Sequence, residues 1–397
     1  MPEAEDGAGV VNAAALLGPR VPAGIGLDAG RAPADALAEL VEGVDARGRH
    51  PYGLPALAAD ELVHFGSCTA NPVTPALLAR HDVLRAATAT IAPERYLQLL
   101  YGAAQCRLAA SGTDAEYSVA LALGDEPFHN VLVDPHEIGS GCARAAAGLA
   151  HVRGGPVTAP LALRVELASV ALRDARGAVL AAEAVDARVI ELVTGLAPRP
   201  VLLHHVPCTK TGLAAPSEAA CIELQRALGP RLRVVVDASQ GRYAHGDVRR
   251  WLDLGWAVIV TGSKFRGAPP FCGATLFPEG WPRALGFPVG PGVVARWRLA
   301  IDALALEPSR RDWACALEQA LLPPLRRLPH FALDGAIERQ GICSFDLGLD
   351  AERTLALHRR LIGRGFFIGQ PVEAGPRRLL RVALGARTLP ARAGAEL

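Results

Sequence analysis

The chain is almost free of lysine. It has 397 residues and 41 basic side chains, yet only Lys210 and Lys264 are lysines. Arginine keeps its proton, whereas a desolvated lysine amine can lose one and attack a carbonyl carbon. The composition therefore singles out two residues for chemistry that arginine cannot perform, and it does not choose between them.

The sequence also lacks an excess of either charge and any long apolar run. Its formal net charge is +1, so nothing points to nucleic acid or an anionic membrane as a partner. No apolar run reaches the roughly 18–20 residues of a membrane-spanning helix. The first residues, MPEAED, are acidic, unlike the basic start of a signal peptide. We expect a cytoplasmic protein.

Metal and nucleotide motifs are missing too. The eight cysteines include no C-x-x-C pair, which argues against a zinc site and favours small core residues in a reducing compartment. Neither G-x-x-x-x-G-K-[ST] nor G-x-G-x-x-G after a strand occurs. We therefore expect no metal. Nucleotide binding through Ser111-Gly112-Thr113 is a weak alternative because both nucleotide motifs are missing.

Short apolar runs alternate with helical stretches from Cys106 onward. The runs lie at 106–110, 130–134, 200–206, 233–237, 256–262 and 274–278, with helical stretches at about 114–124, 140–150, 216–228 and 246–254. This alternation predicts an α/β fold, with a mainly parallel sheet covered by helices on both faces.

The pattern also predicts how the chain is divided. Residues 1–50 form an N-terminal segment, 51–290 a large α/β domain, and 291–397 a small α+β domain with a helix at 351–364. Within the large domain, 160–193 reads as two strands around the turn Asp174-Ala175-Arg176-Gly177 and then a helix. We interpret it as an inserted hairpin.

Chemistry-bearing residues follow three of the apolar runs. Ser111-Gly112-Thr113 lies between a strand and a helix, where free N–H groups and a hydroxyl favour a phosphate, although the same residues are a plain helix cap. Asp237 and Gln240 lie just past a buried strand, in VVVDASQ, where a carboxylate needs a cation unless it too caps a helix. Lys264 follows the strand that ends at Thr261, beside Ser263.

Together these parts match what pyridoxal phosphate requires: an anion cradle, a carboxylate for the ring nitrogen and a lysine amine. Asp237 precedes Lys264 by 27 residues, about one helix and strand, which places both on neighbouring strand ends. Lys264 is thus the residue that we expect to hold pyridoxal 5'-phosphate as a Schiff base.

From about residue 65 to 390 the chain resembles the class V aminotransferase and cysteine desulfurase group of fold-type I pyridoxal-phosphate enzymes. The motifs are VVVDASQG, TGSKFRGAPPFCGATLF, HHVPCTKTG and LLRVALGARTL. The resemblance implies the aspartate aminotransferase fold, with a seven-stranded sheet in the large domain. It also implies a homodimer with active sites at the interface, in which the turn at 288–292 reaches the phosphate site of the neighbouring subunit.

The resemblance also implies roles for individual residues. Lys264 forms the internal aldimine, Asp237 pairs with the pyridine nitrogen, and Arg381 binds the substrate carboxylate. The remaining cofactor contacts are Ser111, Gly112, Thr113, His136, Thr209, Gln240, Thr261 and Ser263. His136 takes the place of the histidine that stacks on the ring, with Glu137 as its rival, and Lys210 is the rival of Lys264.

Several reactions stay open. The segment GRGFFIGQPVEAGPRR contains no cysteine, which argues against a persulfide-forming cysteine desulfurase. Transamination of an amino acid or amine, with Lys264 as general base, is the reaction we expect. Elimination or replacement at the β- or γ-carbon is the alternative, and so is a non-catalytic relative that binds the cofactor.

Overall fold

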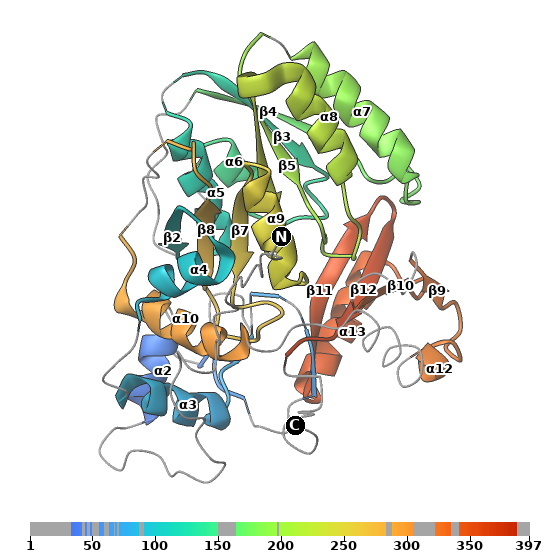
Figure 1. The fold of residues 1–397 in the computed structure, drawn as a ribbon. Coiled ribbons are helices and arrows are strands. Elements are labelled where there is room, and N and C mark those ends of the chain that lie inside the picture. The colour runs from blue at the N-terminus through green and yellow to red at the C-terminus, as the bar shows by residue number, and fades with distance from the viewer. Residues whose placement is uncertain are drawn as a thin grey trace, which may run out of the picture.

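The computed structural model describes residues 33–386 apart from 42–43, 46–47, 50–54, 59–62, 67, 70, 87–90, 125, 150–163, 197, 283–287, 305–321 and 335–340. This part of the chain contains two β-sheets, a larger one at the upper left and centre of Figure 1 and a smaller one at the lower right.

The larger sheet has seven strands in the order β2-β8-β7-β6-β5-β3-β4. All neighbouring pairs are parallel except those of β8, which runs against β2 and β7. The predicted mainly parallel, seven-stranded sheet is confirmed. Its strands are β2 (Gln105–Ala109), β3 (Phe128–Val133), β4 (Val165–Val170), β5 (Val201–His205), β6 (Leu232–Asp237), β7 (Ala257–Thr261) and β8 (Gly273–Phe277).

Helices cover both faces of this sheet because its strands are apolar on both sides. In β6, Val234 and Val236 join one buried core, whereas Val235 joins the core on the other face. The second core includes Ala115 and Val119 of α5. The helices of this region are α4 (Pro93–Tyr101), α5 (Gly112–Ala122), α6 (Cys142–Ala146), α7 (Ala182–Gly195), α8 (Glu218–Leu228), η1 (Gly229–Arg231) and α9 (His245–Asp253).

The smaller sheet joins segments from both ends of the chain. Its order is β1-β11-β12-β10-β9, and β1 lies parallel to β11 although about 300 residues separate them. The helix α13 (Ala351–Gly363) packs against β11 and β12. The strands are β1 (Val63–Phe65), β9 (Ala332–Leu333), β10 (Ile342–Asp346), β11 (Phe366–Ala374) and β12 (Arg377–Ala383).

Among the described residues, the hairpin expected at 160–193 is found only around its turn, where Leu180 bonds to Leu172 and Asp174 to Ala178. Its first strand, β4, is the edge strand of the larger sheet and pairs in parallel with β3 along its whole length. Only one antiparallel bridge, Arg173 to Val179, flanks the turn that follows. As an edge strand, β4 is mostly exposed or half-buried, so its composition resembles that of a hairpin arm. The predicted helix is α7.

The helix after residue 290 belongs with the larger sheet. Val293 and Trp297 of α10 (Pro291–Leu304) lie in its main core, and α10 also packs on α2 (Pro33–Leu40) and α3 (Pro75–Ala86). The division expected at residue 290 therefore differs from where these segments pack. A short helix, α12 (Leu322–Leu325), precedes β9, and residues 1–32 of the expected N-terminal segment lie outside the described ranges.

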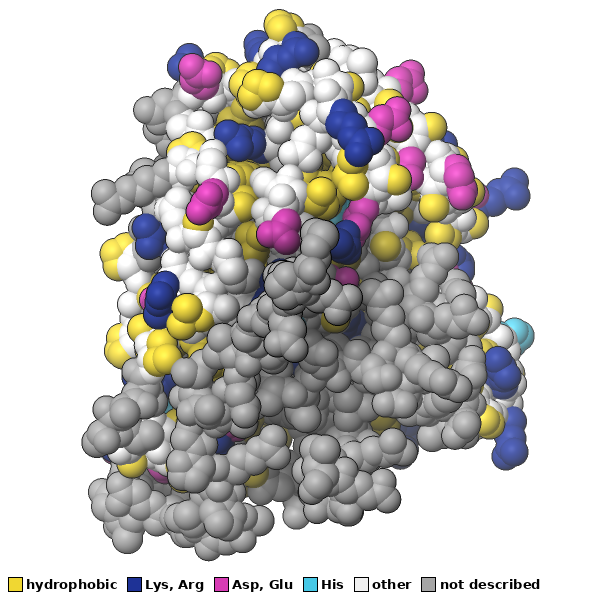
Figure 2. Space-filling view, in the orientation of Figure 1, with side chains coloured by type: hydrophobic (Ala, Val, Ile, Leu, Met, Phe, Trp, Pro, Cys, Tyr) yellow, Lys and Arg dark blue, Asp and Glu magenta, His cyan; other side chains and the backbone are white. Residues whose placement is uncertain are grey.

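Charges of both signs are interspersed with apolar side chains over the described part of the face in Figure 2. In the described ranges, we find no helix with the length and apolar character that crossing a membrane requires.

Candidate active site

A pocket opens between the two sheets, where the carboxyl ends of the parallel strands face β11 and β12. Six of the residues predicted for the site line it: Ser111, Gly112, Thr113, Gln240, Lys264 and Arg381. Ligands of open α/β sheets bind at this end of the strands. The sheet topology thus gathers residues that are up to 270 positions apart in the sequence.

The N-terminus of α5 forms one side of the pocket. Ser111 caps the helix: its hydroxyl accepts a hydrogen bond from the backbone N–H of Asp114 at 3.1 Å. A Cβ atom at Gly273 would lie 2.3 Å from the backbone of Ser111, so only glycine lets β8 approach this turn so closely. The N–H groups of the first helical turn and the hydroxyl of Thr113 suit an anion.

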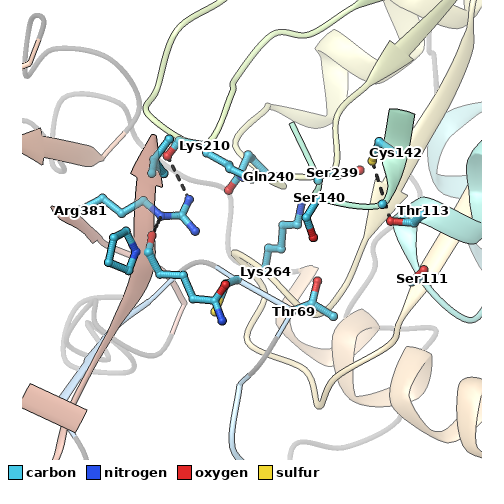
Figure 3. Close-up of a pocket in the computed structure, with 17 residues that line it drawn as sticks. Thr69, Ser111, Thr113, Ser140, Cys142, Lys210, Ser239, Gln240, Lys264 and Arg381 are labelled. Atoms are coloured by element: carbon cyan, nitrogen blue, oxygen red, sulfur yellow. Dashed lines mark hydrogen bonds between the residues drawn. The ribbon is translucent and has the colours of Figure 1, made fainter. Parts of the chain in front are cut away.

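Lys264 lies in the middle of the pocket (Figure 3). It follows β7, which pairs in parallel with β6, so Asp237 at the end of β6 lies on the neighbouring strand. Asp237 is buried beneath the lining residues Ser239 and Gln240, and its carboxylate accepts the N–H of Ser239 at 3.0 Å. The predicted proximity of the amine and the carboxylate thus follows from strand order.

A second carboxyl group lies next to Asp237. The donor atoms of Glu116, Cys142 and Asp237 lie within 4.8 Å of one another, and all three residues are buried. Burial, and next the charge of Asp237, raise the pKa of Glu116 well above its usual range. The raised pKa favours the protonated form of Glu116, since two adjacent buried carboxyl groups repel each other when both are ionised.

His204 completes this buried group. Its Nε2 lies 3.7 Å from Oε2 of Glu116. Burial lowers the pKa of His204 to about 4, against the opposing charge of Asp237. The neutral imidazole is therefore the favoured form of His204 beside these two carboxyl groups. Sequence reasoning missed Glu116 and His204 because each reads as an ordinary residue in an apolar helix or strand.

Arg381 of β12 forms the opposite side of the pocket and is buried. Its Nε donates to the carbonyl of Gln370 at 3.2 Å, and its NH1 donates to the carbonyl of Lys210 at 3.0 Å. A Cβ atom at Gly369 would lie 2.5 Å from the Arg381 Nε. The glycine on β11 thus makes room for the arginine.

The other lysine, Lys210, lines the same pocket. Its ammonium donates to the carbonyl of His136 at 3.2 Å. Burial, and next the charge of Arg381, lower the pKa of Lys210 to about 8. The two lysines of the chain therefore meet in one pocket, one at its centre and one beside Arg381.

An ion-pair network lies behind Lys210. Arg173 donates to Glu137 at 2.7 Å and to both carboxylate oxygens of Asp334 at 3.0 and 2.7 Å. Glu137 also accepts the hydroxyls of Thr209 and Thr211 at 2.8 and 2.7 Å. Because Arg173 follows β4 and Asp334 follows β9, the network joins the two sheets.

Five predicted residues do not line the pocket. The side chain of His136 is 66% exposed and lies near Glu373, so its predicted stacking on a ring has no support in its position. The Thr209 hydroxyl donates a hydrogen bond to the carboxylate of Glu137, and the Thr261 hydroxyl donates to the carbonyl of Ser239 at 2.6 Å. Ser263 and Asp237 are both buried and do not belong to the pocket lining. Asp237 lies beneath the residues that form this lining.

Other pocket residues escaped prediction. They come from the loops at 64–75 and 134–142, whose irregular composition carries no periodic pattern, from the turn after β6, and from β11: Cys68, Thr69, Gly139, Ser140, Gly141, Cys142, Ser239, Gln370, Pro371 and Val372. Two of them correct our expectation that all the cysteines are inert core residues, since Cys68 and Cys142 line the pocket. Burial raises the pKa of the Cys142 thiol to about 12, which keeps it protonated.

No family profile and no curated protein matches this chain. Solved structures do. Serine palmitoyltransferase of Sphingomonas wittichii is 16% identical with a TM-score of 0.58, over 85% of this chain and 88% of that one. The S. paucimobilis enzyme with a bound PLP–myriocin aldimine is 17% identical with a TM-score of 0.57, over 83% and 84%. A NifS-like protein is 14% identical with a TM-score of 0.57, over 82% and 94%.

These similarities confirm the predicted fold, that of the pyridoxal-phosphate-dependent transferases, also known as the aspartate aminotransferase fold. At such identities they concern the fold. The closer assignment to the class V group stays a prediction.

Proposed function

We propose that the protein is a pyridoxal-phosphate-dependent enzyme that acts on an amino acid, and that it is an aminotransferase. One observation carries the proposal: the Lys264 amine lies between a helix N-terminus on one side and Arg381 on the other (Figure 3). An amine so placed has an anion site for a cofactor phosphate on one hand and a carboxylate site for a substrate on the other.

The donor set fits pyridoxal phosphate. Ser111, Gly112 and Thr113 would hold the phosphate, Lys264 the aldehyde carbon, and Asp237 the ring nitrogen. Asp237 suits this role because it is a buried carboxyl group, and burial and its charge both raise the pKa of the neighbouring Glu116. When bound, the cofactor withdraws electrons from the substrate Cα and makes its proton acidic.

Arg381 and Lys264 can perform the two remaining tasks, which are binding the substrate and transferring its proton. Arg381 fixes the α-carboxylate by a two-pronged hydrogen bond and so orients the Cα–H bond. Lys264 Nζ takes the proton from Cα and later returns a proton, as a general base and then a general acid. A site that grips the carboxylate favours reactions that keep it, which argues for transamination over decarboxylation.

The two lysines allow a matched test of the cofactor site. Protein reconstituted with pyridoxal phosphate should be yellow, and Lys264→Ala should lose the visible absorbance band while Lys210→Ala keeps it. Borohydride reduction followed by peptide mass spectrometry should find the cofactor mass on the peptide that contains Lys264. A wild-type protein that stays colourless, or a cofactor fixed on Lys210, would overturn the proposal.

The reaction is tested separately. The reconstituted enzyme is incubated with single amino acids and a keto-acid acceptor, and keto acid, ammonia and sulfide are measured. Transamination yields a new amino acid in proportion to the keto acid. Release of ammonia or sulfide without that product would replace the aminotransferase with an eliminating enzyme.

A further inference from the structure

The pocket holds more positive charge than the proposed chemistry uses. Lys264, Lys210 and Arg381 all line it, and no Asp or Glu belongs to the described residues that do so. Covalent attachment of a cofactor accounts for Lys264, and one substrate carboxylate accounts for Arg381. Lys210 is left over, although it is one of only two lysines in 397 residues.

Neither Lys210 nor Arg381 has an ion-pair partner within the described ranges. Their hydrogen bonds go to neutral carbonyl groups instead: those of His136 for the ammonium, and of Gln370 and Lys210 itself for the guanidinium. A buried cation without a counter-charge is costly. Arg381 is buried and Lys210 is half-buried, so an anionic ligand would remove this cost mainly for Arg381 and in part for Lys210.

Lys210 and Arg381 lie on the same side of the Lys264 amine. Arg381 donates to the backbone of Lys210, so both belong to the same side of the pocket, with the helix N-terminus opposite and Lys264 between them (Figure 3). A substrate attached near Lys264 would therefore meet both cations at its far side. Mutual repulsion of the cations is consistent with the low pKa of Lys210, about 8, whose second cause is Arg381.

We propose that the substrate is an amino acid with a second anionic group on its side chain, and that Lys210 binds this group while Arg381 binds the α-carboxylate. The proposal rests on the proposed function. It makes Lys210 a specificity-determining residue and not a participant in the proton transfer. A side-chain carboxylate, sulfonate or phosphate offers the same chemistry to an ammonium.

Isosteric amino acids isolate the charge of the side chain. The reconstituted holoenzyme is titrated with aspartate and asparagine, with glutamate and glutamine, and with cysteate and phosphoserine, and dissociation constants are read from the change of the absorbance band. We expect the anionic member of at least one isosteric pair, or one of the two stronger acids, to bind about 10- to 100-fold more tightly than its neutral counterpart. Serine is the neutral counterpart of the stronger acids.

Variants of Lys210 then assign the preference. In Lys210→Gln the ratio of the two dissociation constants should fall to about one, and Lys210→Arg should restore most of it because the charge returns. Equal binding of anionic and neutral amino acids by the wild type would overturn the proposal, as would a preference that survives in Lys210→Gln. The absorbance band reports separately on the proposed function: its presence in these variants shows that the cofactor site is intact whichever way the ratio falls.

Discussion

Arg173 and Arg381 are two buried arginines on either side of the Lys210 loop, and they differ in what they bind. Arg173 meets the carboxylates of Glu137 and Asp334. Arg381 donates only to backbone carbonyls among the described residues. Burial lowers the pKa of Arg381, whereas for Arg173 the effect of burial is outweighed by its two carboxylate partners, so its pKa is raised.

The difference separates a structural arginine from a ligand-binding one. A buried guanidinium whose charge is cancelled within the protein has nothing left to offer a ligand, while one bonded only to neutral groups still lacks its counter-charge. Arg173 therefore connects the two sheets through its ion pairs, and Arg381 can still form an ion pair with the carboxylate of a ligand. Changing Arg173 or Arg381, or a residue beside one of them, and comparing the outcomes tests this distinction.

The largest effect is expected on stability. Arg173→Met should lower the free energy of unfolding by about 3–5 kcal/mol, because it leaves the buried carboxylate of Glu137 without a cation. The matched Arg381→Met loses only hydrogen bonds to neutral groups and should cost about 1–2 kcal/mol. Urea unfolding followed by circular dichroism measures both, and equal losses would contradict the distinction.

Ligand binding should show the reverse order. In reconstituted protein, Arg381→Met should weaken the binding of an amino acid substrate by about 30-fold, since a charged hydrogen-bonded pair contributes about 2 kcal/mol. Arg173→Met should change it by less than about threefold in the folded protein. Spectral titration gives both dissociation constants. A larger effect from Arg173 would mean that the network shapes the pocket.

Gly369→Ala disturbs Arg381 without removing it. The new Cβ atom would lie 2.5 Å from the guanidinium Nε, so the side chain must shift. We expect affinity for an amino acid substrate to fall about tenfold, or about 1.4 kcal/mol, with the Arg173 network unaffected. Gly363→Ala is a suitable control because a Cβ atom there meets no neighbour within 4 Å.

The smallest effect concerns pH. The pKa of Lys210 is about 8, so its amine is charged below that pH and neutral above it. Affinity for an amino acid with an acidic side chain should therefore fall about three- to fourfold from pH 7 to 8.5. The ratio of affinities for aspartate and asparagine removes the pH dependence of everything they share. In Lys210→Gln this ratio should not vary with pH, and a persisting slope would assign the titration to another group.

Sequence reasoning placed the residues whose positions follow from strand order. Asp237 and Lys264 end adjacent parallel strands, and Ser111 caps the helix after another strand, so each position could be predicted from an apolar run and the polar residue after it. His136 failed because it lies in an irregular turn, where a shift of one residue decides which side chain is buried. There Glu137 is buried and His136 is exposed.

Strands that alternate with helices, polar residues at the strand ends and a scarcity of lysine can all be read from the amino-acid sequence alone. These are local properties, since the periodicity of a strand and the cap of a helix depend on neighbouring residues. The packing of the two sheets brings Lys210 and Arg381 to one side of a pocket whose described lining has no carboxylate, and it gives Arg173 two carboxylate partners. Contacts across 160 or more positions, from Arg173 to Asp334 and from Arg381 to the Lys210 backbone, depend on this packing, which no local pattern encodes.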